Sequence, residues 1–319
     1  MSMRKIATFL FFVALVGIGT FYYFQHKEDF HLITNVSTGT IFVLSIISLI
    51  ILFCYGLQLK IITSHYNLNL NFLQWFGLPR VTLFINMWLP LVGGASMKAI
   101  YLKKFHGFKY SSFIASMGIT NIIKLMITSL FAIILIWFFK DGASMFLFVV
   151  AGTIFTGTLT FLLFAHRIRL YYFLPSNYIK SVIDEWQKIR TDHKMIRKLI
   201  VVNSFIFILT SLLIYFAFQA FAINISLISS GIIAAFTIIA GVVNLIPGNF
   251  GIREAIIIAI SGIHGIETNE GLHAAVLVRI IGIVWTLVLT PFFAHKLFPK
   301  RSKPLMEKVE IKYNQASQE

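Results

Sequence analysis

The stretch that decides the fold is residues 227–263, LISSGIIAAFTIIAGVVNLIPGNFGIREAIIIAISGI. It is apolar nearly throughout, and its only charged side chains are Arg253 and Glu254. A helix cannot continue through the segment 246–251, because Pro lacks a backbone donor and Gly admits dihedrals that other residues avoid. We therefore predict two short helices that enter and leave a membrane on one side, a re-entrant hairpin, in place of a single span.

The rest of the chain has the composition of a membrane protein. Of 319 residues, 58% are hydrophobic and 12% are charged, whereas soluble domains carry about a quarter of charged residues. About 20 apolar residues in a helix cross the hydrocarbon and satisfy every backbone group internally. The fold class we predict is all-α integral membrane, with about six full transmembrane helices at residues 6–24, 41–59, 113–139, 143–165, 199–222 and 274–294.

A second broken region covers residues 81–102, where Leu89-Pro90 and Gly93-Gly94 interrupt the apolar run. If this region crossed the membrane, Lys103 would face outside, which the positive-inside rule disfavours. A second re-entrant hairpin removes the conflict. Both termini and most Lys and Arg then lie in the cytoplasm.

The two broken regions share an order of residue types: Asn, Pro, Gly, then a base. The breaks are formed by Asn86, Pro90, Gly93 and Gly94 in the first region and by Asn244, Pro247, Gly248 and Gly251 in the second, followed by Lys98 and Arg253. The first hairpin opens to the cytoplasm and the second to the outside, so the halves form an inverted repeat. Many transporters build a mid-membrane site in this way. One such break is commonly a mere kink, but two in corresponding positions favour a binding site.

The expected organisation has five parts, separated by composition and charge. They are residues 1–30 as an uncleaved first helix, 38–166 as the first repeat, 167–198 as a cytoplasmic amphipathic linker, 199–297 as the second repeat, and 298–319 as a cytoplasmic tail.

The segments Asn244–Glu254 and Ala274–Arg279 resemble the lysylphosphatidylglycerol synthase transmembrane region family, which comprises flippase-like membrane proteins. The resemblance covers nearly the whole chain. It implies movement or presentation of a phosphate-bearing lipid, either a phospholipid or a polyprenyl-phosphate-linked lipid, across a bacterial cytoplasmic membrane. Fused members carry a soluble aminoacyl-transferase domain. Since this chain ends soon after its last span, we do not expect it to make a lysyl-lipid.

The first half departs from the family pattern. Ala95 and Lys98 stand where the family has an acid and an Arg, and the next span shows Thr120, Asn121 and Lys124 in place of an acidic–Arg pair and a further acid. We therefore expect the second half to carry more of the site.

The candidate lipid phosphate-binding residues are Arg253, Arg279, Glu254, Lys124 and Lys98. Guanidinium keeps its charge when dehydrated and binds phosphate through two parallel hydrogen bonds. Two alternatives stay open: Glu254 could hold either Arg in a structural pair, and Lys124 could extend along a lipid-facing surface to the headgroups. Asn86 and Asn244 could cap broken helices or contact a headgroup.

Other function classes fit the sequence less well. The net charge of +15 could suggest nucleic acid, but most of the 33 Phe lie in apolar runs, so we expect no nucleic-acid partner. A single cysteine, Cys54, permits neither a disulfide nor a Cys-based metal site. We expect no metal, no cofactor and no enzymatic activity; the partners are lipids with anionic headgroups and, as candidates, envelope-biosynthesis proteins. The alternatives are a non-transporting subunit of an envelope-biosynthesis complex and an enzyme acting on polyprenyl-phosphate sugars.

Overall fold

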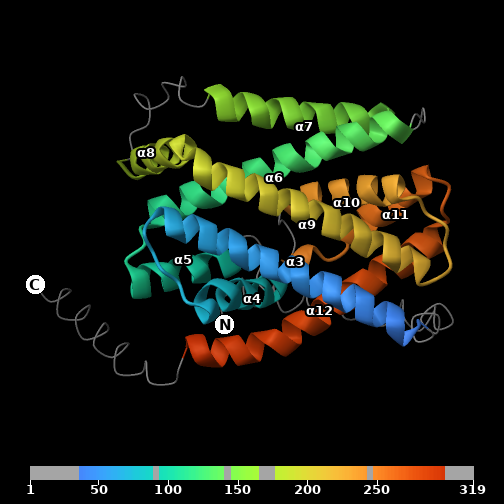
Figure 1. Ribbon diagram of the computed structural model, residues 1–319, viewed down its shortest axis with the longest axis horizontal. Coiled ribbons are helices and arrows are strands. Elements are labelled where there is room, and N and C mark those ends of the chain that lie inside the picture. Colours follow the sequence, from blue (N-terminus) through green and yellow to red (C-terminus); the bar gives the residue numbers. More distant parts are fainter. Residues whose placement is uncertain (1–35, 89–92, 140–144, 165–176, 243–246, 299–319) are drawn as a thin grey trace, which may run out of the picture.

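The computed structural model describes residues 36–88, 93–139, 145–164, 177–242 and 247–298, and every regular element within these ranges is a helix (Figure 1). Five of the helices are long and apolar enough to cross a membrane. They are α3 (Thr38–His65), α6 (Tyr110–Phe139), α7 (Met145–Phe164), α9 (His193–Gln219) and α12 (Thr268–Leu297). The predicted span 6–24 lies outside the described residues.

Polar residues set where two of the long helices begin. The Ser37 hydroxyl accepts a hydrogen bond from the Thr40 amide at 3.1 Å at the start of α3, and Asp192 accepts one from Met195 at 2.9 Å at the start of α9. Such caps satisfy amides that have no partner in the first turn. The second carboxylate oxygen of Asp192 lies 2.6 Å from His65 Nδ1, which ties the end of α3 to the start of α9.

Four short helices form two pairs. The first pair is α4 (Phe72–Trp88) with α5 (Gly93–His106), and the second is α10 (Leu227–Val242) with α11 (Ile252–Ile263). The members of each pair pack against each other. In Figure 1 the first pair lies at the end of the long helices where α8 (Asn177–Thr191) lies, and the second pair lies toward the opposite end.

Each pair packs against a long helix from the other part of the chain. α4 lies against α12, and α10 lies against α6. α3 packs against α9, and a buried hydrogen bond from Gln58 Nε2 to Asn203 Oδ1, 2.9 Å long, joins them. Interhelical polar bonds of this kind are typical of helices packed within a membrane. The two parts of the chain are therefore interlocked.

The exterior of the bundle is apolar. Phe42, Trp137 and Phe146 are 65%, 68% and 73% exposed, which is the pattern expected when hydrocarbon and not water surrounds a protein. The largest buried cluster includes Leu44 of α3, Ala132 of α6 and Phe218 of α9. The core therefore lies where the long helices cross.

Helix α8 occupies part of the expected amphipathic linker and packs against α6. Ile189 is fully buried, and the Trp186 ring lies 5.4 Å from that of Phe161 on α7. Glu185 accepts hydrogen bonds from Ser112 of α6 at 3.0 Å and from Lys188 at 2.8 Å. Burial raises the pKa of Glu185, but these hydrogen bonds outweigh that effect and hold its pKa below the ordinary value.

Candidate functional site

The second break is built from left-handed backbone. After α10, the short 3₁₀ turn η3 (Pro247–Asn249) leads to Gly251, which precedes α11. Gly248, Asn249 and Gly251 have φ angles of 62°, 52° and 83°, a region in which Gly carries little steric cost. A Cβ on Gly248 would also lie 2.7 Å from the Phe250 ring. Position 248 therefore favours glycine for two reasons: its positive φ, and the lack of space for a Cβ beside Phe250.

Arg279 of α12 clamps this break. Its Nη1 donates to the Gly248 carbonyl at 2.9 Å and its Nη2 to the Asn249 carbonyl at 3.0 Å, while its Nε donates to Glu254. The other carboxylate oxygen of Glu254 accepts from the Gly251 amide at 2.9 Å. The guanidinium also lies 4.7 Å from the centre of the Phe250 ring. Arg279 and Glu254 therefore form the structural pair that the sequence left open as an alternative to phosphate binding.

Arg253 is placed differently from Arg279. Among the described residues it has no hydrogen-bond or ion-pair partner, although its charge is close enough to interact with those of Arg279 and Glu254. These three side chains line a cavity of about 10 Å³ together with apolar residues of α11 and α12. That volume holds about one water molecule, so a headgroup requires the helices to separate.

At the first break, Asn86 caps the following helix. Its Oδ1 accepts a hydrogen bond from the Gly94 amide at 2.9 Å, and α5 begins at Gly93. A Cβ on Gly94 would fall 2.5 Å from Asn86 Oδ1 and closer still to the Thr82 carbonyl. The capping interpretation of Asn86 thus agrees with the structure. Pro90 and Asn244 lie outside the described residues, and Pro247 is described only as the start of η3.

The two breaks touch. The turn η3 packs on α4, and a Cβ placed on Gly248 would lie 3.5 Å from the Cα of Met87, near the C-terminal end of α4. Segments that are about 160 residues apart in the sequence therefore come into contact.

Sequence analysis missed Arg80. It was not among the candidate residues, yet it lies within α4 and is 0% exposed. Its Nη2 donates to the Leu52 carbonyl at 2.9 Å. Its Nε and Nη1 have no hydrogen-bond partner in the part of the chain that is described. The apolar residues of 72–78 before Arg80 could have indicated a buried helix.

Lys98 and Lys124 point toward the same region. Lys124 Nζ lies 5.4 Å from the centre of the Tyr55 ring on α3, and is therefore directed into the bundle. Lys98 Nζ lies 5.6 Å from the Phe113 ring centre, and its charge is close enough to be repelled by those of Lys124 and Arg80.

Tyr55 lies between the two halves of this region, since Arg80 and Arg253 are both near it. We call the group the cationic cluster; it consists of Arg80, Lys98, Lys124, Arg253 and Arg279, with Tyr55 and Glu254.

The charge of the cationic cluster determines what it can bind. Glu254 is the only carboxylate in it, and Arg279 already pairs with that group. Bases at membrane depth are costly unless they are paired or face a polar ligand, and the ligand that fits them is an anion. Within the described ranges no three or more His, Cys, Asp or Glu side chains come together as a metal site would require.

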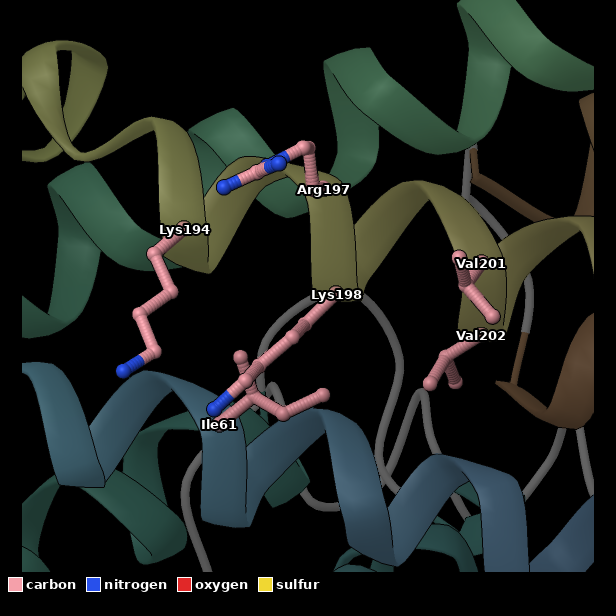
Figure 2. Close-up of a pocket in the computed structure, with 6 residues that line it drawn as sticks. All are labelled: Ile61, Lys194, Arg197, Lys198, Val201 and Val202. Carbon is pink, nitrogen blue, oxygen red and sulfur yellow. The ribbon is translucent and has the colours of Figure 1, made fainter.

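A larger hollow lies elsewhere. A groove of about 440 Å³ between α3 and α9 is lined by Ile61, Lys194, Arg197, Lys198, Val201 and Val202. Figure 2 shows Lys194 and Lys198 reaching toward α3 and Arg197 pointing away from it. All three bases are exposed, as is usual where helices meet lipid headgroups. We therefore assign the candidate site to the cationic cluster, whose bases are buried or half-buried, despite its smaller cavity.

Comparison with known proteins agrees with the resemblance. A family model described as Lysylphosphatidylglycerol synthase TM region matches residues 3–290. A comparison with curated proteins gave no match. Since the family match spans most of the chain and five helices have the length and composition of spans, the protein is a multi-pass membrane protein that belongs to the lysylphosphatidylglycerol synthase transmembrane region family.

Proposed function

We propose that the protein is a flippase-like transporter that translocates or presents a phosphate-bearing lipid across the cytoplasmic membrane of a bacterium. The observation that carries this proposal is the cationic cluster: in the described part of the chain, its four bases other than Arg279 form no ion pair with a carboxylate. A phosphate headgroup supplies the missing negative charge while its tail remains in lipid. The proposed role involves no covalent chemistry.

The proposed topology follows from the two helix pairs. We propose that α4–α5 and α10–α11 are re-entrant hairpins of an inverted repeat. Their positions near opposite ends of the long helices (Figure 1) and the exchanged packing of α4 on α12 and α10 on α6 support this arrangement. Contact between η3 and α4 brings the second break against the first helix pair. The site then lies between the leaflets, as in many transporters built from inverted repeats.

The proposed orientation places α8 and both termini in the cytoplasm. At the end of the bundle where α8 lies, α5, α9 and α12 carry Lys103, Lys104, Lys194, Lys198 and Lys296. The opposite loop carries Glu267 and Glu270. Such a distribution obeys the positive-inside rule. The five-part division of the chain predicted above is retained within this proposal.

The test is reconstitution of the purified full chain in liposomes that contain phosphatidic acid or phosphatidylglycerol labelled on an acyl chain. Chemical quenching of the outer leaflet then measures lipid movement. We expect wild type to move at least one of these lipids faster than protein-free liposomes do, and Arg253→Ala to move it at the protein-free rate. Lys104→Ala, which removes an exposed base at the end of α5, is the matched control and should keep the wild-type rate.

Two results would overturn the proposal. One is a wild-type rate that equals the protein-free rate with both lipids, which would favour the non-transporting subunit of an envelope-biosynthesis complex. The other is an Arg253→Ala protein that is folded and as fast as wild type.

A further inference from the structure

We infer that the cationic cluster selects a headgroup with two negative charges, a phosphate monoester or a diphosphate, and that buried Arg80 is one of its ligands. This inference rests on the proposed function and adds the charge class of the cargo. It separates such lipids from phosphodiester lipids, which carry one charge at phosphate, and from lipids whose headgroup is cationic.

Arg80 is the first reason. It is fully buried, and one nitrogen is satisfied by the Leu52 carbonyl, whereas Nε and Nη1 have no partner among the described residues. An uncompensated buried guanidinium is strongly unfavourable. Nε and Nη1 lie on different edges of the planar group, so Arg80 keeps two separate donors that can each reach a phosphate oxygen.

The balance of charge is the second reason. Arg279 is neutralised by Glu254 and has three hydrogen bonds within the break. Within the described residues, Arg80, Lys98, Lys124 and Arg253 form no ion pair with a carboxylate, and the one carboxylate near Arg253, that of Glu254, is paired with Arg279. A ligand with one negative charge balances one of these four bases and leaves three unbalanced. A ligand with two negative charges leaves two of them unbalanced. The second negative charge of the ligand therefore adds attraction to these bases. That attraction is strong because water and salt screen charges less inside the protein than at its surface.

The positions of these donors are the third reason. They come from both sides of the contact between the breaks: Arg80, Lys98 and Lys124 from α4, α5 and α6, and Arg253 from α11. Tyr55 lies near members of both groups: its ring centre is 5.4 Å from Lys124 Nζ, and Arg80 and Arg253 are both near it. A ligand with several charged oxygens can bind both groups at once, whereas a diester has one oxygen pair to offer. An ammonium-bearing headgroup is repelled from either side.

The experiment compares two ligands that differ by one methyl group. Decyl phosphate carries up to two charges, and methyl decyl phosphate carries one. Each is added to the detergent-purified full chain below its micelle concentration, and affinity is obtained from the rise in the thermal unfolding midpoint. At pH 7.5 we expect the monoester to bind about tenfold more tightly than the diester.

Lowering the pH provides an internal control. The second pKa of a phosphate monoester is about 6, so its dianion falls roughly tenfold between pH 7.5 and pH 5. Because the monoanion should bind about as weakly as the diester, monoester affinity should fall about fivefold, while diester affinity stays constant. The groups facing the ligand are those of the cationic cluster, and no histidine of the described residues belongs to it.

Three variants test whether the preference for the monoester depends on the cationic cluster. Arg80→Met should leave the unliganded unfolding midpoint unchanged or higher, because it removes a buried charge, and should abolish the monoester preference. Lys124→Met, from a different helix, should reduce the preference and serves as the second probe if Arg80→Met does not fold. Lys104→Met removes an exposed base and should keep the preference.

The outcomes distinguish this inference from the proposed function. Equal binding of the two ligands at pH 7.5, or a preference that survives in folded Arg80→Met and Lys124→Met, would overturn the dianion inference and leave lipid transport standing. Absence of binding by both ligands, together with absence of lipid movement in liposomes, would overturn both.

Discussion

At the residue scale, Gly94 sets how closely two helices approach. Its missing side chain lets the start of α5 lie against Thr82 and Asn86 of α4, so that the Asn86 side chain reaches the Gly94 amide at 2.9 Å. Small residues permit this kind of backbone contact between membrane helices. The close packing of α5 on α4 therefore depends on the absence of a Cβ at Gly94.

We predict that Gly94→Ala destabilises the protein. The added Cβ would overlap Asn86 and the Thr82 carbonyl, and overpacking of this kind costs about 1–3 kcal/mol. Thermal unfolding in detergent should show a lower midpoint. The matched control is Gly152→Ala on α7, where nothing lies within 4 Å of the new atom; an equal effect in both variants would contradict the prediction.

The Arg279–Glu254 pair gives a second prediction at this scale. Each side chain is largely buried, so Glu254→Gln alone should cost about 2–3 kcal/mol because Arg279 is left without its counter-charge. Arg279→Gln should cost more, since it also releases the Gly248 and Asn249 carbonyls. In a double-mutant cycle followed by thermal unfolding, the double variant should lose less than the sum of the two. Strict additivity would show that the two side chains do not stabilise each other.

The sequence indicated some of these roles and missed others. The segment 246–251 identified the break, since Pro and Gly act locally. It could not reveal which base would clamp the break, because Arg253 and Arg279 both lie within reach of Glu254 and only helix packing decides between them. Arg80 was missed because it stands just before the predicted region 81–102 and beside Pro79, a residue that disfavours a helix interior, although that Pro lies within α4.

At the scale of elements, α8 shows how a polar helix is held outside the spans. Its Ile189 is buried in the core, and its Glu185 accepts a hydrogen bond from Ser112 on α6. Apolar residues that recur at helical spacing, with polar residues between them, predicted this helix. That pattern did not indicate that the apolar side of α8 would face other helices and not the lipid headgroups, because tertiary packing decides this.

We predict that α8 loosens in acid. The pKa of Glu185 is lowered in the folded protein, so its contribution to stability is present above the unfolded value of about 4.3 and is lost as the pH falls through the folded value. Hydrogen exchange of residues 177–191, corrected for intrinsic rates, should show less protection below about pH 4.

Two variants separate this effect from others. Glu185→Gln should reduce protection at neutral pH and remove most of the acid dependence. Asp192 also has a lowered pKa, caused by the hydrogen bond from the Met195 amide and then by His65; Asp192→Asn should leave the acid response of α8 in place. An unchanged pH profile in Glu185→Gln would assign the response to another group.

At the scale of the whole molecule, the proposed topology predicts which loops face which side. In a Cys54→Ala background, which removes the only cysteine, Lys104→Cys at the end of α5 should react with a membrane-impermeant thiol reagent only after cells are permeabilised. Asn269→Cys, in the first turn of α12, should react in intact cells. Both positions are exposed. Labelling of both from the same side would contradict the orientation.

Hydropathy was sufficient for most of the architecture. The described long helices coincide with five of the predicted spans because an apolar run of that length has few alternatives to a membrane helix. The start of α4 at Phe72, well before the predicted region 81–102, was not foreseen, because Pro79 disfavours a helix that tertiary packing stabilises.

The exchanged packing of the short helices limits how the molecule can move. α4 rests on α12 and α10 rests on α6, so swinging either half as a rigid body would open both contacts simultaneously and expose Arg80. A displacement of one helix pair along its long neighbour, a shear motion, keeps most of that packing. We therefore expect any transport cycle to move the short helix pairs over small distances along a fixed frame of long helices, while the turn bonded to Arg279 moves as one rigid unit.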